Sequence, residues 1–175
     1  MRYDRPSTDG SDAMGGDVRT VAEIVKRQFG PQLEMVRAAV LACPADAFEG
    51  GKIGPREHLY HALVGMDVWL TEDVSSFPFD RIVDRDAAEL RGPASSAVSR
   101  SFLLEYADRL IAKVDALADD DAALLSPSSA RGGEFTLLDR CIAQFRHVQH
   151  HVGVVNTMLR ERKLPAVRWL GYGEE

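Results

Sequence analysis

Cysteine is scarce in this sequence, with only Cys43 and Cys141 among 175 residues. The two lie far apart, form no Cys-x-x-Cys pair and have apolar neighbours. This spacing excludes the paired-cysteine zinc and redox motifs. We therefore predict two reduced, buried thiols. Because stable disulfides belong to oxidising compartments, the chain is expected to be cytoplasmic.

Long apolar runs and clustered basic residues are also missing. No segment reaches the roughly 18 apolar residues that a membrane span requires, and the N-terminus lacks a charged-then-apolar signal pattern. Asp and Glu number 27 against 21 Lys and Arg, so the formal net charge is −6. The basic residues are scattered rather than gathered on the single face that binds nucleic acid. We therefore expect neither a membrane nor a nucleic acid as partner.

The common catalytic motifs are absent as well. The sequence has no HExxH, GxSxG or GxGxxG and no P-loop. It also lacks the Glu-x-x-His pairs of di-iron bundles, because Glu57 and His61 are four residues apart and the last predicted helix supplies no matching carboxylate. These absences exclude the corresponding enzyme classes and direct attention to other polar clusters.

Apolar residues recur at helical spacing, and no convincing strand alternation is present. We predict helices over 18–43, with a kink or a fresh start at Gly30-Pro31, over 55–73, around 102–117 and over 134–163. Residues 1–17 are rich in Gly, Asp and Ser and are expected to form a flexible tail. The remainder, 18–175, is predicted to be a single all-α domain, a four-helix bundle. The long connection 75–97 would let the second and third helices run parallel.

All five histidines fall in two short segments. His58 and His61 lie in the second predicted helix, and His147, His150 and His151 lie in the fourth. Random placement would scatter five residues along the chain. The clustering therefore predicts one site that is assembled from two helices.

The spacing of the histidines indicates which of them face inward. His147 and His151 are four residues apart, so they lie on one helix face and can converge on one metal ion. At about 100° per residue, His150 points furthest outward and Gln144 shares the side of His147. A helical wheel does not decide between His58 and His61.

A lone pair of histidines on a helix arises often by chance, and a buried histidine is usually just hydrogen-bonded. The fourth-helix pair alone would favour that ordinary interpretation. The second cluster, in a chain with no other histidine, favours a metal site.

The two segments resemble one family. "GPREHLYHALVGMDVWL" followed by "HVQHHVGVVNTMLR" looks like the DinB-like (YfiT-like) metalloprotein superfamily. The first part of its pattern is matched by Arg56, Glu57, Leu59, His61 and Trp69, and the second part by the late histidines of the sequence HVQHH. The resemblance covers residues 20–162, and its specificity rests on these two segments.

The resemblance implies a fold, a cofactor and an assembly. It implies a four-helix bundle with a long crossover between helices 2 and 3, and often a homodimer. It also implies a divalent ion, Zn, Ni or Fe, that is held by His61, His147 and His151. His58 and His150 fall on positions that are not ligands in the pattern. In several members such a site activates a low-molecular-weight thiol.

The first functional hypothesis is a metal-dependent enzyme that activates a thiol or water, similar to a thiol S-transferase and acting on a small-molecule substrate. No catalytic residue is assigned. Gln144 is either a ligand-binding group or a buried polar spacer, and Glu57 and Tyr60 are either acid–base groups or structural residues, with the structural role favoured.

Two other hypotheses stay open. One is a non-catalytic metal-binding or stress-related protein whose ion stabilises the bundle. The other is a metal-free bundle with hydrogen-bonded histidines. Near the C-terminus, packing on the bundle or on a partner chain is the favoured role for Trp169, Leu170 and Tyr172.

Overall fold

A computed structural model describes residues 19–71, 73–117, 121–127 and 133–171. The tail predicted over residues 1–17 and Tyr172 lie outside these ranges. Within them all regular structure is helical, and the only β pairing is an isolated bridge between Pro127 and Thr136. The all-α prediction is confirmed.

The described residues form long helices, which make up the bundle, and short helices, which lie in the connections between them. The long ones are α1 (Val21–Ala42), α3 (Pro55–Trp69), α5 (Arg100–Asp115) and α7 (Leu137–Glu161). The short ones are α2 (Ala45–Phe48), η1 (Val74–Ser76), η2 (Phe79–Arg81), α4 (Arg85–Ala88) and α6 (Asp121–Leu125). Helix α3 packs against α5 and α7, and α1 packs against α5 and α7. One apolar core lies between them.

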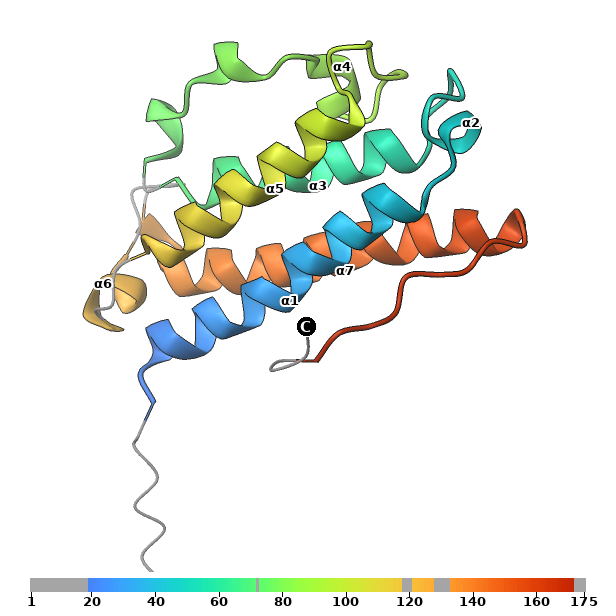
Figure 1. Cartoon of the computed structure of the whole chain (residues 1–175). Coiled ribbons are helices and arrows are strands. Elements are labelled where there is room, and N and C mark those ends of the chain that lie inside the picture. The colour runs from blue at the N-terminus through green and yellow to red at the C-terminus, as the bar shows by residue number, and fades with distance from the viewer. Residues whose placement is uncertain (1–18, 72, 118–120, 128–132, 172–175) are drawn as a thin grey trace, which may run out of the picture.

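The long helices run in two directions (Figure 1). α1 and α7 point one way, whereas α3 and α5 point the opposite way. The chain leaves α3 at one end of the molecule and passes over it through η1, η2 and α4 before α5 begins at the other end (Figure 1). The long connection therefore makes the second and third long helices parallel.

Helix α1 continues through Pro31, so the fresh start that was one of the two alternatives predicted there is wrong. A proline inside a helix removes one backbone hydrogen bond and costs about 3 kcal/mol. Phe29, Leu33 and Val36 are fully buried around it. Each such side chain contributes roughly 1.5–3 kcal/mol, so packing outweighs the lost bond.

Helices α3 and α7 are shorter than the sequence patterns predicted. α3 ends at Trp69 rather than near residue 73, because Asp73 accepts a hydrogen bond from the amide of Ser75 and begins η1. α7 begins at Leu137 rather than at residue 134, because Thr136 and Asp139 form a reciprocal capping box. Local polar caps thus set the helix limits.

The crossover is tied to α3 by buried polar groups. Glu57, which is 1% exposed, accepts hydrogen bonds from the backbone N–H groups of Ala94 (2.7 Å) and Gly54 (2.9 Å) and from Nε of Arg56 (3.1 Å). The guanidinium of Arg56 also donates to the carbonyl of Ala94 (2.6 Å). These bonds hold the crossover against the N-terminal turn of α3.

The C-terminal segment returns along α7 (Figure 1). The Asn156 side chain exchanges two hydrogen bonds with the backbone of Val167, and Leu170 packs against the core. Trp169 does not pack on the bundle, because 67% of it is exposed, and its packing on a partner chain stays a prediction. Along this segment an aliphatic side chain, rather than the indole, faces the core.

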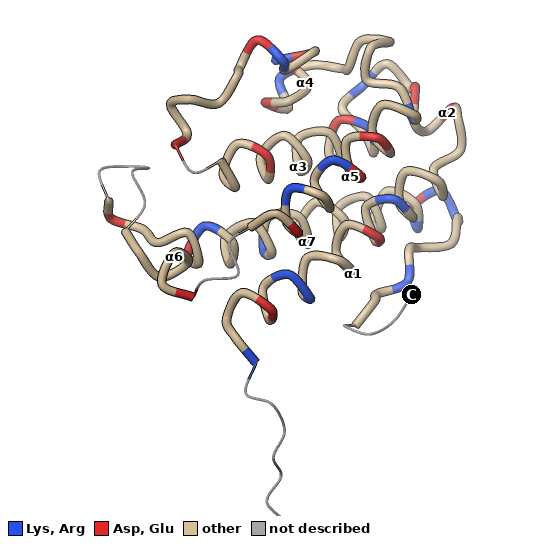
Figure 2. Tube along the Cα trace, turned by 60° about the vertical axis from the view of Figure 1, so that its left-hand side comes forward, with Lys and Arg blue, Asp and Glu red and all other residues tan. Residues whose placement is uncertain are grey.

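The remaining predictions on composition can be placed in the structure. Cys43 and Cys141 are free, buried thiols, as predicted, and burial raises the pKa of Cys141 to about 11. Basic and acidic residues are interspersed along the helices (Figure 2). In the part of the chain that the structure describes, every helix is too short or too polar to span a bilayer.

Candidate metal centre

Three of the five histidines converge at the contact between α3 and α7. His61 on α3 and His147 and His151 on α7 each offer a ring nitrogen, and these nitrogens lie within 4.8 Å of one another. His151 is 5% exposed, and the other two are partly buried. These are the three residues that the resemblance implied as metal ligands.

The two inward histidines of α7, His147 and His151, face each other through their Nε2 atoms. Nε2 of His151 lies 3.1 Å from Nε2 of His147. The four-residue spacing places the two imidazoles one above the other on the face that packs against α3. The convergence of this pair, predicted from the spacing, is confirmed.

Hydrogen bonds to Nδ1 orient two of the rings. Nδ1 of His61 lies 2.6 Å from the carbonyl oxygen of Ala88 in α4, and Nδ1 of His147 lies 3.1 Å from Oε1 of Gln144. Both oxygens are acceptors, so Nδ1 carries the proton in each ring. Nε2 is then left with a free lone pair, which is the form that binds a metal.

His58 orients the third ring. Its Nδ1 lies 3.0 Å from Nδ1 of His151. If Nδ1 of His151 donates this bond, His58 accepts it and Nε2 of His151 is left to face His147. The helical wheel could not choose between His58 and His61, whereas the family resemblance implied His61. In the structure His61 joins the converging group, and His58 contacts the outer nitrogen of His151.

His150 takes no part in the converging group. It is exposed on α7, as the helical wheel predicted, although its ring centroid lies 5.0 Å from that of His151. The cluster HVQHH therefore supplies two inward rings and one outward ring.

A glycine that the sequence analysis did not single out makes room for His147. A Cβ atom at Gly65 on α3 would lie 2.6 Å from Cε1 and 3.1 Å from Nδ1 of His147. Real Cβ contacts are not that short, so any larger residue would displace the ring. The only signal in the sequence is that Gly65 lies one helical turn after His61.

The site keeps the imidazoles of its two α7 histidines neutral. Burial, followed by the charges of neighbouring histidines, lowers the pKa of His151 to about 3 and that of His147 to about 4. Burial also lowers the pKa of His58. The rings of His147 and His151 are therefore unprotonated near pH 7, and neutral imidazole is the species that coordinates a metal.

Glu57 and Tyr60 have structural roles. The carboxylate of Glu57 is engaged by the crossover. Tyr60 is 1% exposed, packs against the rings of Phe102 and Tyr106, and its hydroxyl accepts a hydrogen bond from the amide of Asp84 (3.4 Å). The favoured structural interpretation of both residues agrees with these contacts.

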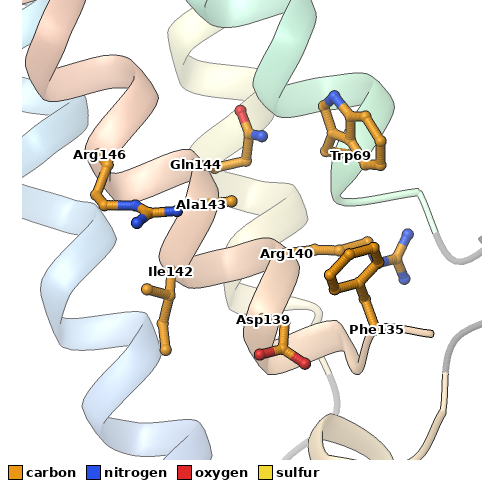
Figure 3. A pocket seen from close by; sticks show the side chains of 8 residues that line it. All are labelled: Trp69, Phe135, Asp139, Arg140, Ile142, Ala143, Gln144 and Arg146. Atoms are coloured by element: carbon orange, nitrogen blue, oxygen red, sulfur yellow. The ribbon is translucent and has the colours of Figure 1, made fainter.

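One cavity is lined by a histidine of the site, and a second is lined by a residue that contacts the site. One, of about 190 Å³, lies between α3 and the crossover and is lined by His61, Gly65 and Trp69. The other, of about 450 Å³, is lined by Trp69 and Gln144 among others (Figure 3). Gln144 is 5% exposed and contacts His147, so this larger cavity lies directly behind a residue that orients the site.

The donor set fits a divalent transition metal. Three imidazole nitrogens suit Zn, Ni, Fe and Cu alike, so the set does not select one metal. Three protein ligands are the number found in catalytic zinc sites, where a further position is left for water or substrate. The fit rests on the three orienting hydrogen-bond partners as much as on the histidines themselves.

Comparisons with protein-family models, with curated proteins and with solved structures gave no match to this chain.

Proposed function

We propose that this chain is a divalent-metal-binding protein of the DinB-like kind, with His61, His147 and His151 as the ligands. Two observations support the family. The two histidine segments lie on the second and fourth long helices, and a long crossover separates parallel helices α3 and α5.

The observation that carries the metal site is the arrangement of the ring nitrogens. Three imidazoles from two helices converge within 4.8 Å. Nδ1 of His61 and Nδ1 of His147 face oxygen acceptors that leave Nε2 free for an ion, and Nδ1 of His151 does the same when it donates to His58. A histidine cluster that served only as a buried hydrogen-bond network would not need all three rings to be turned in this way.

We further propose that the site belongs to an enzyme of the thiol S-transferase type, which takes a low-molecular-weight thiol and a small-molecule electrophile. A divalent ion supplies Lewis acidity that lowers the pKa of a thiol or of water. In such a transfer the sulfur forms a bond to carbon, the leaving group departs with its electron pair, and the thiol proton passes to solvent. The two adjoining cavities support turnover, because a purely structural ion needs neither. The family resemblance also favours a homodimer.

The first test is elemental analysis of protein purified without an affinity tag. We expect about one divalent ion per chain, as for a single three-histidine site, and loss of that ion in His61→Ala and His147→Ala. His150→Ala is the matched control, because His150 is exposed on α7 outside the converging group. If the wild-type protein holds no stoichiometric metal even after reloading, the metal-site proposal fails.

The second test asks which small molecule the site takes. Cobalt-loaded protein should develop a near-ultraviolet charge-transfer band when a low-molecular-weight thiol such as cysteine is added, and His147→Ala should not. A stable loaded protein that binds no thiol and hydrolyses no ester would instead favour the alternative, a metal-binding or stress-related protein without turnover. The hydrogen bond from His61 to the carbonyl of Ala88 is the observation that favours this alternative, because an ion bound to His61 would also tie the crossover to α7.

A further inference from the structure

The larger of the two cavities is big enough to bind a small molecule. It lies between the C-terminal end of α3 and the first turns of α7 (Figure 3) and has a volume of about 450 Å³. Small-molecule sites in proteins fall in the range of about 300–1,000 Å³. The cavity is therefore large enough to hold an organic compound and not only water.

Gln144 links this cavity to the histidines. Its Oε1 accepts from Nδ1 of His147 (3.1 Å), and Figure 3 shows its amide on the side of α7 that faces Trp69. Among the described residues, its Nε2 makes no hydrogen bond. A side chain that is 5% exposed thus keeps a donor available toward the cavity. A ligand there would need to offer an acceptor.

The wall of this cavity carries more positively than negatively charged side chains. Arg140 and Arg146 both line the cavity. The single acidic residue, Asp139, already accepts two hydrogen bonds from Thr136 (2.8 and 2.9 Å). Arg146 is exposed and has no ion-pair partner among the described residues. The wall therefore favours an anion.

The rest of the wall is apolar and incompletely covered. Phe135 is 40% exposed and Ile142 is 46% exposed, and the indole of Trp69 lines the cavity on the same side of α7 as Phe135 (Figure 3). Aromatic and aliphatic walls with a few polar groups are typical of sites that bind the body of an organic ligand.

We propose that this cavity binds an organic carboxylate with an aromatic body. Arg146 attracts the carboxylate, Trp69, Phe135 and Ile142 contact the body, and the Gln144 amide donates to an oxygen of the ligand. That this carboxylate is the substrate or its acceptor half rests on the proposed function. The binding itself does not.

The test uses Trp69 as the reporter. Trp69 and Trp169 are the only tryptophans, so Trp169→Phe leaves one indole, in the cavity wall. We expect 3-phenylpropanoate to change the fluorescence of Trp69 saturably, and the neutral 3-phenylpropan-1-ol and the small anion propanoate to bind more weakly. Equal binding of all three probes, or no saturable change, would overturn the proposal.

A matched pair of variants tests the charge. Arg146→Gln should raise the Kd of 3-phenylpropanoate about fivefold, as expected for one partly solvated ion pair, and leave the Kd of the alcohol unchanged. Arg160→Gln, at an exposed position on the same helix, should change neither. If both variants weaken binding equally, the effect is one of net charge and the cavity site is wrong.

Metal content measured on the same samples separates the two proposals. His61→Ala should lose the ion and still bind 3-phenylpropanoate, because His61 does not line this cavity. Binding without metal in the wild type would refute the metalloenzyme alone. Metal without binding would refute the carboxylate site alone.

Discussion

Gly65 is a residue at which the addition of a single methyl group should weaken metal binding. A methyl group there would come within 2.6 Å of the His147 ring. In Gly65→Ala the ring must rotate, and Nε2 leaves its position near His151. Displaced ligands and orienting groups typically change metal affinity 10–100-fold, so we expect a loss of at least about tenfold, measured by competition with a chelating dye.

Gly153→Ala is the matched control, since Gly153 lies on α7 and a Cβ there meets nothing within 4 Å. Alanine favours the helix by about 0.8–1 kcal/mol over glycine. This variant should therefore melt higher and keep its metal affinity. Equal metal affinity in the two variants would contradict the steric role of Gly65.

His58 should act through His151 rather than on the ion. His58→Phe keeps a ring in place and removes the nitrogen that lies 3.0 Å from Nδ1 of His151. Loss of an orienting partner should weaken metal binding about tenfold without abolishing the stoichiometry, which titration calorimetry would report. His150→Phe should have no such effect. Complete loss of the ion in His58→Phe would instead make His58 a ligand.

At the scale of the element, the N-terminal turn of α3 and the crossover form one unit around Glu57. Three donors converge on its buried carboxylate. Glu57→Ala leaves them without an acceptor and should reduce the free energy of unfolding by about 3 kcal/mol, as for other broken buried ion pairs. Urea denaturation measures this loss.

Two variants complete that experiment. Glu105→Ala, at an exposed position on α5, should change stability by less than about 0.5 kcal/mol. Glu57→Gln, at a temperature where it stays folded, should retain its metal. A folded Glu57→Gln protein that binds metal normally and loses all activity would show that Glu57 has a chemical role and not only a structural one.

At the scale of the whole molecule, an ion at the site would join three parts of the chain. His147 and His151 lie on α7. His61 lies on α3 and is hydrogen-bonded to the carbonyl of Ala88 in α4. An ion that binds only the folded state adds about 2.7 kcal/mol at a free concentration of 100 times its Kd. For a chain of this size that corresponds to a rise in Tm of roughly 5–10 °C.

Calorimetric scans of the loaded and chelated protein measure this shift. His61→Ala should melt at the same temperature with and without metal. A shift of the same size in His61→Ala would place the stabilising ion elsewhere. No shift in the wild type would favour a bundle that uses its histidines only for hydrogen bonding.

How much of this could be predicted is clearest from the histidines. Helical spacing is a local property, so the sequence alone predicted that His147 and His151 face inward and that His150 faces out. The same holds for the long helices, whose apolar repeats follow from their own periodicity. Helix limits were less predictable, because the caps at Thr136 and Asp73 compete with that periodicity over three or four residues.

The sequence by itself thus determined an all-α chain with two histidine faces and a crossover long enough to let the second and third long helices run parallel. The helical wheel left His58 and His61 open and the resemblance implied His61; the tertiary structure showed that His61 joins the converging group, and it alone brought Gly65, Gln144 and the carbonyl of Ala88 to the site. The physical reason is that these roles depend on how α3 meets α7 and α4. The rotation and separation of packed helices are properties of pairs of surfaces, and no periodicity within one helix encodes them.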